Sequence, residues 1–267
     1  MLKKNLLPGL LALASLMVAN GSAAALITPS VALTGGTAYT TGGISGLATT
    51  GYDMAGTLIT ATFADGSTET LTWAAINQAA GRGGASAVDG RWSLSMSGDS
   101  NLNPWVLELA TTFQGLMVGL FIDLRPASAL FDVVVNPEGS PGSSFGSNIG
   151  ASNGSASSAN WMDGPSGLVV DGTYSNQLSI GNTFYGDLYL TLGLGFSGTQ
   201  RNGLGAGDLL IFRSDTDRLA TAGDLVISGD NGNGNGNGNG GNPVPVPGTL
   251  ALLGLGLLGL GVRRRRE

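Results

Sequence analysis

Apolar residues occupy every second position in several stretches of this chain, and this period of two constrains the fold more than any other feature. The clearest stretches are residues 92–96, 105–109, 116–124 and 188–196, and shorter ones lie at 133–135, 168–170, 177–180, 209–212 and 225–227. Such alternation predicts β-strands that bury one face. Between Gly84 and Gly229 no stretch has the periodicity of an amphipathic helix. We therefore predict an all-β fold of about ten to twelve strands, packed as an antiparallel β-sandwich of jelly-roll type.

A β-hairpin is predicted around Asp65-Gly66, because residues 56–63 and 67–73 both alternate and an Asp-Gly pair suits a tight turn. The side chains expected to point inward are those of Phe63, Leu71 and Trp73, whereas the threonines at positions 68, 70 and 72 should meet solvent. The residues that follow, 74–80, are expected to form a short helix or one helical turn.

Three of the four tryptophans, Trp73, Trp92 and Trp105, are in phase with neighbouring strand positions, so we predict that they lie in the core. Trp161 is different, because it follows a segment rich in Gly, Ser and Asn at 137–160, which we expect to be a long surface loop. An exposed tryptophan could stack on a sugar ring, so Trp161 is the candidate ligand-binding residue. Gly193 and Gly195 interrupt a leucine-rich strand, where we expect a bend or a close sheet contact.

Both ends of the chain carry targeting signals. Residues 1–25 combine Lys3 and Lys4, an apolar run at 6–18 and small residues at 21–25, the pattern of a secretory signal peptide. The mature chain is expected to start between about Gly21 and Leu26. A β-sandwich domain is then expected at 26–228, followed by an Asn/Gly-rich flexible linker at 229–242.

The extreme C-terminus predicts a marginal membrane anchor. Residues 249–262 contain no charge, and Arg263, Arg264, Arg265 and Arg266 follow them directly. A helix over 249–262 would cover about 21 Å, which is short of the roughly 30 Å hydrocarbon core of a bilayer. The arginines should stop the helix on the cytoplasmic side of the inner membrane, which places the body beyond that membrane.

This tail resembles the PEP-CTERM sorting signal, in which a proline motif precedes a short apolar helix and a basic cluster. The motif reads Pro245, Val246, Pro247 and Gly248 here, with Val246 in place of the family's usual Glu. The resemblance implies an exosortase-like membrane protease as a partner, besides signal peptidase, the general secretion machinery and inner-membrane lipid. It also implies transient anchoring and then release to the cell surface or the extracellular space. The alternative is a plain C-terminal anchor.

Composition excludes many classes of enzyme. The chain has no Cys and no His, and the body between the two signals has no Lys, which rules out Ser-His-Asp and Cys-His systems, Ser-Lys dyads and His- or Cys-bound metals. The body holds six Arg against 17 Asp and Glu, so its net charge is 6 − 17 = −11. This charge argues against nucleic acid as a partner. We expect no cofactor.

Carboxylates remain as the chemistry that the body could use. A pair of carboxylates suffices for glycoside hydrolysis, and the glutamates of the body are Glu69, Glu108 and Glu138, of which Glu108 should face water. A structural Ca²⁺ is a further alternative, for which the side chains of Asp215 and Asp217 with Asp208, or of Asp99 near Asn101 and Asn103, would supply oxygen ligands.

Residues 92–132 resemble exported domains that often precede this kind of tail. We therefore predict an exported, non-enzymatic surface or matrix protein, associated with exopolysaccharide or biofilm by binding or as a structural component. The alternative is a carboxylate-dependent polysaccharide hydrolase.

Overall fold

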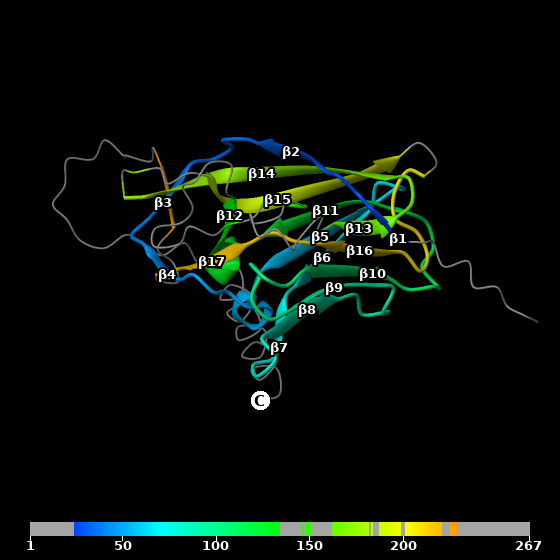
Figure 1. Ribbon diagram of the computed structural model, residues 1–267, viewed down its shortest axis with the longest axis horizontal. Helices are drawn as coiled ribbons and strands as arrows, with labels where there is room; N and C mark the ends of the chain where they lie inside the picture. Colours follow the sequence, from blue (N-terminus) through cyan, green and yellow to red (C-terminus); the bar gives the residue numbers. More distant parts are fainter. Residues whose placement is uncertain are drawn as a thin grey trace, which may run out of the picture.

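A computed structural model describes residues 24–133, 146, 148–150, 162–181, 183, 187–198, 201–220 and 225–228. In these residues the chain is almost entirely β-structure, arranged as two sheets that face each other (Figure 1). The predicted all-β fold is confirmed. Two short 3₁₀ helices, η1 (Gly51–Met54) and η2 (Arg125–Ala127), accompany the strands.

The seven-stranded sheet has the spatial order β1-β13-β16-β10-β9-β8-β7. Its strands are β1 (Ala24–Leu26), β7 (Ala74–Asn77), β8 (Arg82–Ser86), β9 (Trp92–Ser97), β10 (Trp105–Leu109), β13 (Asp163–Pro165) and β16 (Leu209–Phe212). All of its ladders are antiparallel. Strands β7 to β10 follow one another in sequence and in space, so they form a meander.

The eleven-stranded sheet has the order β18-β3-β14-β15-β11-β5-β6 along its main path. Its strands are β2 (Ser30–Leu33), β3 (Tyr39–Thr41), β4 (Ile44–Gly46), β5 (Leu58–Phe63), β6 (Thr68–Thr72), β11 (Met117–Asp123), β12 (Ala129–Val133), β14 (Leu168–Ile180), β15 (Asp187–Gly198), β17 (Thr216–Leu219) and β18 (Val226–Ile227). Strands β2 and β3 pair with β14 in parallel, whereas the other ladders of this sheet are antiparallel.

The described residues hold 18 strands, more than the ten to twelve expected from the periodicity. Several of the additional strands, such as β1 and β4, are only three residues long, too short for an alternation to be recognised. Conversely, the separate candidates at 168–170 and 177–180 are parts of the single 13-residue strand β14.

The predicted hairpin is confirmed as β5 and β6, paired antiparallel from Leu58 with Thr72 to Thr62 with Thr68. In the turn, Gly66 has a φ of 84°, and the Ser67 amide donates to Asp65 Oδ1 at 2.9 Å. Phe63 and Trp73 are buried and the threonines of β6 are exposed, as expected, while Leu71 is half-buried.

The helix expected at 74–80 is wrong, because residues 74–77 form strand β7 at the edge of the seven-stranded sheet. Ala74 pairs with Gly84 and Ala75 with Gly83. The alanines favour a helix only slightly, and backbone pairing with β8 outweighs that preference. The chain passes from the edge of one sheet to the edge of the other at Trp73, the only residue between β6 and β7.

The alternation expected from 116 to 124 is correct only in its second half. Leu120, Ile122 and Leu124 are buried, but Met117 is buried in place of Leu116 and Val118, which are half-buried. The register of β11 against β5 shifts between Met117 and Gly119. An extra residue in one strand of a pair reverses the inward and outward positions beyond it.

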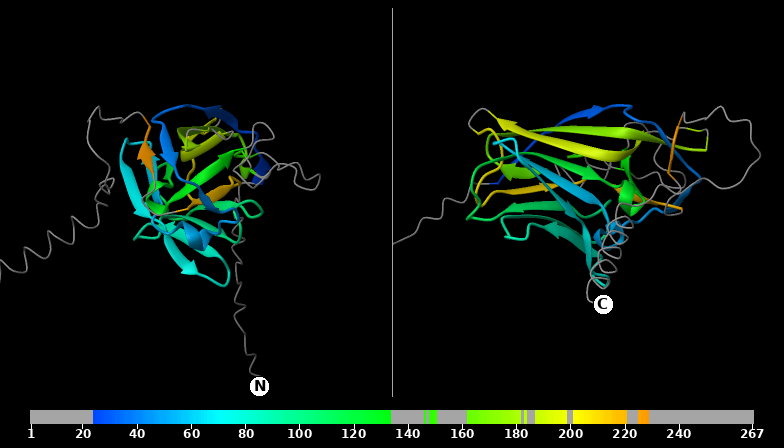
Figure 2. Two further views of the ribbon diagram at one scale, coloured as in Figure 1. Left: turned by 90° about the vertical axis from the view of Figure 1, so that its left-hand side faces the viewer. Right: turned by 180° about the vertical axis from the view of Figure 1, so that it is seen from behind.

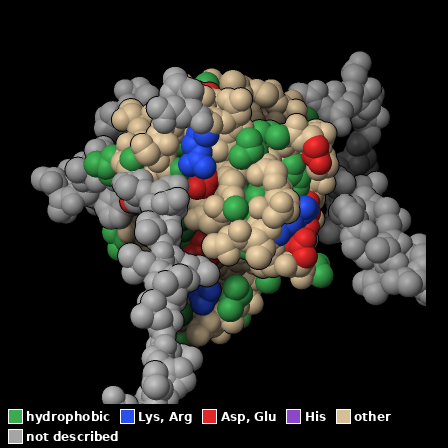
Figure 3. Space-filling view, turned by 90° about the vertical axis from the view of Figure 1, so that its right-hand side faces the viewer, with side chains coloured by type: hydrophobic (Ala, Val, Ile, Leu, Met, Phe, Trp, Pro, Cys, Tyr) green, Lys and Arg blue, Asp and Glu red, His purple; other side chains and the backbone are tan. Residues whose placement is uncertain are grey.

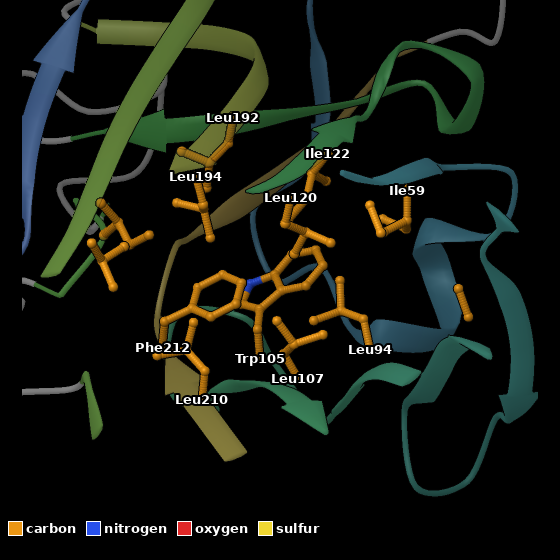
Figure 4. Close-up of a cluster of buried hydrophobic side chains, with 14 of the residues drawn as sticks. Ile59, Leu94, Trp105, Leu107, Leu120, Ile122, Leu192, Leu194, Leu210 and Phe212 are labelled. Carbon is orange, nitrogen blue, oxygen red and sulfur yellow. The ribbon is translucent and has the colours of Figure 1, made fainter. Parts of the chain in front are cut away.

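The core lies between the two sheets, which Figure 2 shows as two layers in its right-hand view. Trp73, Trp92 and Trp105 are at most 1% exposed, so their predicted place in the core is confirmed. Each large side chain buried in this way contributes about 1.5–3 kcal/mol to folding. Around Trp105, Figure 4 shows Leu94, Leu107, Leu210 and Phe212 from one sheet, facing Ile59, Leu120, Ile122, Leu192 and Leu194 from the other.

Several predictions fall outside the described residues. They are the signal peptide except for its last two residues, the linker, the sorting signal with Pro245 to Gly248 and Arg263 to Arg266, Trp161, Glu138 and most of the loop at 137–160. Within the ranges that the structure describes, there is no helix of the length and hydrophobicity that crossing a membrane requires.

Candidate functional site

Glu69 is held by two neighbours instead of being available as an acid or base. Its Oε2 accepts hydrogen bonds from Arg91 Nη2 at 2.8 Å and from the buried Trp92 Nε1 at 2.6 Å. The Arg91 guanidinium also lies over the Phe63 ring, 4.6 Å from its centroid. Charge-assisted bonds of this kind fix side chains strongly. Glu69 therefore anchors the side chain of Trp92 in the space between the sheets.

Glu108 lies on the opposite side of the seven-stranded sheet from Glu69. Glu108 is exposed, as expected, and pairs across the ladder with Ser93. The side chain of Trp92, which bonds Glu69, points to the core, and the next residue Ser93 points away from it. Because successive residues of a strand face opposite sides, the backbone of the sheet separates the two carboxylates. They do not form the pair that glycoside hydrolysis requires.

The aspartates considered for calcium lie in three separate segments: Asp99 between β9 and β10, Asp208 directly before β16, and Asp215 and Asp217 at the start of β17. Asp208 receives bonds from Arg201 Nη2 and from the Gly205 amide, whereas Asp215 receives them from Ser100 Oγ and the Thr216 amide. Asp99 accepts a bond from the Asn101 amide at 2.9 Å. In the part of the chain that is described, no group of three or more acidic side chains is placed to hold a metal ion.

A buried acidic cluster lies where β12 and β17 run side by side. Asp132, Asp215 and Asp217 are each at most 1% exposed, and the Asp132 amide donates to the carbonyl of Asp215 at 3.2 Å. Burial, followed by the charge of Asp217, raises the pKa of Asp215 to about 8. The cluster can hold a proton at neutral pH, but solvent and large substrates do not reach it.

An accessible surface of a different kind lies on the outer face of the eleven-stranded sheet. Phe121 is 39% exposed in β11, between the buried Leu120 and Ile122, so its side chain is on the side away from the other sheet. Its ladder partners are Thr60 on β5 and Gly193 on β15. Beyond them stand Thr70 on β6 and Thr173 on β14. We call the row Thr70, Thr60, Phe121, Gly193, Thr173 the platform.

Glycine keeps the platform low beside the Phe121 ring. A Cβ atom added to Gly193 would lie 3.8 Å from Phe121 Cδ2, so a side chain there would stand against the ring. In the adjacent row Gly119 pairs with Gly195, which extends the low area. Neither Gly193 nor Gly195 makes the close sheet contact expected from the sequence, because the nearest atoms to an added Cβ are 3.8 Å away.

Hydroxyl groups surround the aromatic ring on the platform. Thr70 is exposed and Thr60 half-buried, and their Oγ1 atoms lie 2.8 Å apart. Thr173 is half-buried at the other end of the row. A flat apolar ring between hydrogen-bonding hydroxyls matches the two surfaces of a sugar, whose faces carry C–H groups and whose edges carry hydroxyls.

Asp123, a charged side chain near the platform, is already paired. Asp123, two residues from Phe121, accepts bonds from Arg125 Nε at 2.8 Å and from Arg125 Nη2 at 2.6 Å. Arg125 Nη1 donates to the hydroxyl of Tyr39. At one end of the molecule, Figure 3 likewise shows basic side chains next to acidic ones, with apolar side chains in small separate groups. Asp171, two residues before Thr173 on β14, is exposed and has no ion pair among the described residues, so the unpaired charge beside the platform is negative.

Sequence reasoning did not single out Phe121, although a signal was present. Phe121 stands out of phase in the alternation of residues 120–124, so it was the large apolar residue placed to face solvent. The neighbours that complete the platform come from four other strands, and their pairing cannot be read from one sequence. Trp161, the residue proposed from the sequence, lies outside the described residues.

The fold defines this protein as a two-sheet, all-β domain. At its C-terminus, residues 243–266 match the family model of the PEP-CTERM protein-sorting motif. The chain thus carries a PEP-CTERM sorting signal, as predicted, and is an exported protein sorted by an exosortase, a membrane protease. No curated protein and no solved structure matches the chain. The sorting signal indicates how the protein is exported, and the surfaces of the body indicate what it can bind.

Proposed function

We propose that this is a non-enzymatic protein of the cell surface or extracellular matrix, and that its body binds exopolysaccharide through the platform. The observation that carries the proposal is the exposed ring of Phe121, set between Thr60 and Gly193 in the middle of a sheet. Among the exposed large apolar side chains of the described residues, that of Phe121 is the only aromatic one, and an aromatic ring can stack on a sugar. Export through the exosortase route brings such a surface to the outside of the cell.

The ligand that best fits the platform is an uncharged polysaccharide. The row crosses five strands, which at a spacing of about 4.8 Å makes it roughly 19 Å long, enough for several sugar rings in line. The body's net charge of −11 repels polyanions, while the threonine hydroxyls donate and accept hydrogen bonds without preference for charge. The separation of Glu69 from Glu108 supports binding without hydrolysis.

The test compares Phe121→Ala with Val169→Ala in the exported protein. Val169 is 43% exposed on β14, where its ladder partner is Ser197, so it is a matched apolar residue outside the platform row. We expect Phe121→Ala to weaken binding to uncharged glucans about tenfold, in line with the 0.5–1.5 kcal/mol typical of aromatic contacts. Val169→Ala should bind as the wild type does, and alginate, a polyanion, should not bind.

Affinity electrophoresis in gels containing each polysaccharide measures this binding directly. Equal retardation of wild type and Phe121→Ala would show that the platform is not the binding surface. A reducing-sugar assay on the same samples should stay at the blank level. Release of sugar that is lost in Glu69→Gln or Glu108→Gln would favour the hydrolase instead.

A further inference from the structure

The outer face of the seven-stranded sheet is hollowed. Two adjoining hollows of about 440 and 450 Å³ share Ser93 and Glu108. One extends over β8 toward Arg82 and Ile76, and the other extends along β10 toward Leu209. Together they form a continuous depression that crosses the strands, which we call the trough.

Small side chains produce the trough. Ser93 lies between Ser86 and Glu108 in the ladders, and Ser95 lies between Gly84 and Val106. These residues face outward, while their neighbours Trp92, Leu94 and Met96 fill the core. The pattern Trp-Ser-Leu-Ser-Met of β9 thus supports a packed interior and a low outer surface at the same time.

The floor of the trough carries polar groups that have no partner within the described part of the chain. The hydroxyls of Ser93 and Ser95 and the carboxylate of Glu108 make no side-chain hydrogen bond or ion pair there. Arg82 at one end of the trough is likewise exposed and without an ion pair among these residues. Two hydroxyls and a carboxylate can accept hydrogen bonds from several sugar hydroxyls at once.

We propose that the trough is a second binding site for an uncharged polysaccharide, and that the trough and the platform together let one molecule cross-link two polysaccharide chains. The cross-linking rests on the function proposed above for the platform. Glu108 in the middle and Arg82 at one end make the trough a poor match for either a polyanion or a polycation. An uncharged polysaccharide that lies across the strands is repelled by neither Glu108 nor Arg82.

The two sites point in opposite directions. The platform lies on the outer side of the layer that contains β11 and β15, and the trough on the outer side of the layer that contains β8, β9 and β10 (Figure 1). The sheets themselves are about 10 Å apart, with the core between them. An extended chain that lies flat on one face does not contact the other, so two occupied sites mean two chain segments bound.

The test uses four versions of the exported protein: wild type, Glu108→Ala, Phe121→Ala and the double variant, with Val169→Ala as a control. Both single changes are at exposed positions, and circular dichroism checks that each variant is folded. Affinity electrophoresis in a soluble uncharged glucan reports binding. The storage modulus of a glucan solution after addition of protein reports cross-linking, and light scattering reports whether the protein is a monomer.

We expect the wild type and Val169→Ala to raise the modulus at least several-fold over glucan alone. Each single variant should still bind the glucan but lose this rise, and the double variant should lose binding. A monomeric Glu108→Ala that still raises the modulus would overturn the trough as a site while leaving the platform intact. Failure of the wild type to bind any uncharged glucan would overturn the proposed function, and the cross-linking with it.

Discussion

Carboxylates in this protein have three different roles, and the surroundings of each residue decide which one it takes. Glu69 forms an ion pair with Arg91 and accepts a hydrogen bond from the indole N–H of Trp92, so it holds the side chain of Trp92 in the core. Asp215 is buried among other acids, which favours its neutral form. Glu108 is exposed on an outer face, with no partner among the described residues, and is therefore the one placed to meet a ligand.

The protonation of Asp215 gives a prediction for stability against pH. Burial raises its pKa from 3.8 in the unfolded chain to about 8 in the folded protein. Between these values the folded protein holds a proton that the unfolded chain has released, so stability falls as the pH rises through this window and becomes level above it. The Asp215→Asn variant has no proton to release at this position. Its free energy of unfolding should therefore fall less steeply from pH 5 to pH 8 than that of the wild type.

Urea denaturation of both proteins at several pH values between 5 and 9 measures the effect. The difference between the two curves isolates Asp215 from Asp132 and Asp217, which remain in both proteins. Asparagine keeps an oxygen that can accept the bond from Ser100 Oγ, so the substitution preserves that contact. Parallel stability curves for the two proteins would contradict a raised pKa at this residue.

Elements whose signal is local were predictable from the sequence, whereas elements that depend on distant partners were not. The β5–β6 hairpin follows from alternation and from Asp65-Gly66, both within one short stretch. Strand β7 forms only because β8 pairs with it, and the bulge in β11 depends on the register of β11 against β5. Neither feature can be predicted from the local sequence. Phe121 could be placed on an outer face, but its companions on the platform depend on the register of β5, β14 and β15.

The turn of the β5–β6 hairpin can be tested by a pair of glycine substitutions. Gly66 has a φ of 84°, where a side chain is strained, although no atom lies within 4 Å of an added Cβ. Gly66→Ala should lower the free energy of unfolding by about 1–2 kcal/mol through this strain alone. Gly35 has equally open surroundings without a positive φ, so Gly35→Ala should leave stability unchanged or raise it by about 0.4–1 kcal/mol.

Thermal unfolding of the two variants beside the wild type gives the comparison. Only the backbone conformation distinguishes the two positions, since both are exposed and free of neighbours. If Gly66→Ala were as stable as Gly35→Ala, the turn would have to adopt another conformation than the one that the hairpin register requires.

At the scale of the whole molecule, the predicted signal peptide adjoins the folded domain at strand β1. The sequence places signal cleavage between about Gly21 and Leu26, and the structure narrows this range, because Ala24 pairs with Pro165 and Leu26 with Asp163. Cleavage after Ala25 would remove most of β1 from the edge of the seven-stranded sheet. Cleavage after Ala23 keeps the strand and has small residues, Gly21 and Ala23, at the positions that signal peptidase reads.

We therefore expect the mature protein to begin at Ala24. Intact-mass analysis and N-terminal sequencing of protein recovered outside the cell determine both ends together. A C-terminus near Pro245 to Gly248 is expected if the exosortase accepts Val246 in the motif, and retention of Glu267 would show that it does not. A mature chain that begins at Ile27 would lack β1 altogether, and its β13 would then be the exposed edge strand of the sheet. That outcome would contradict the pairing of β1 as part of the exported fold.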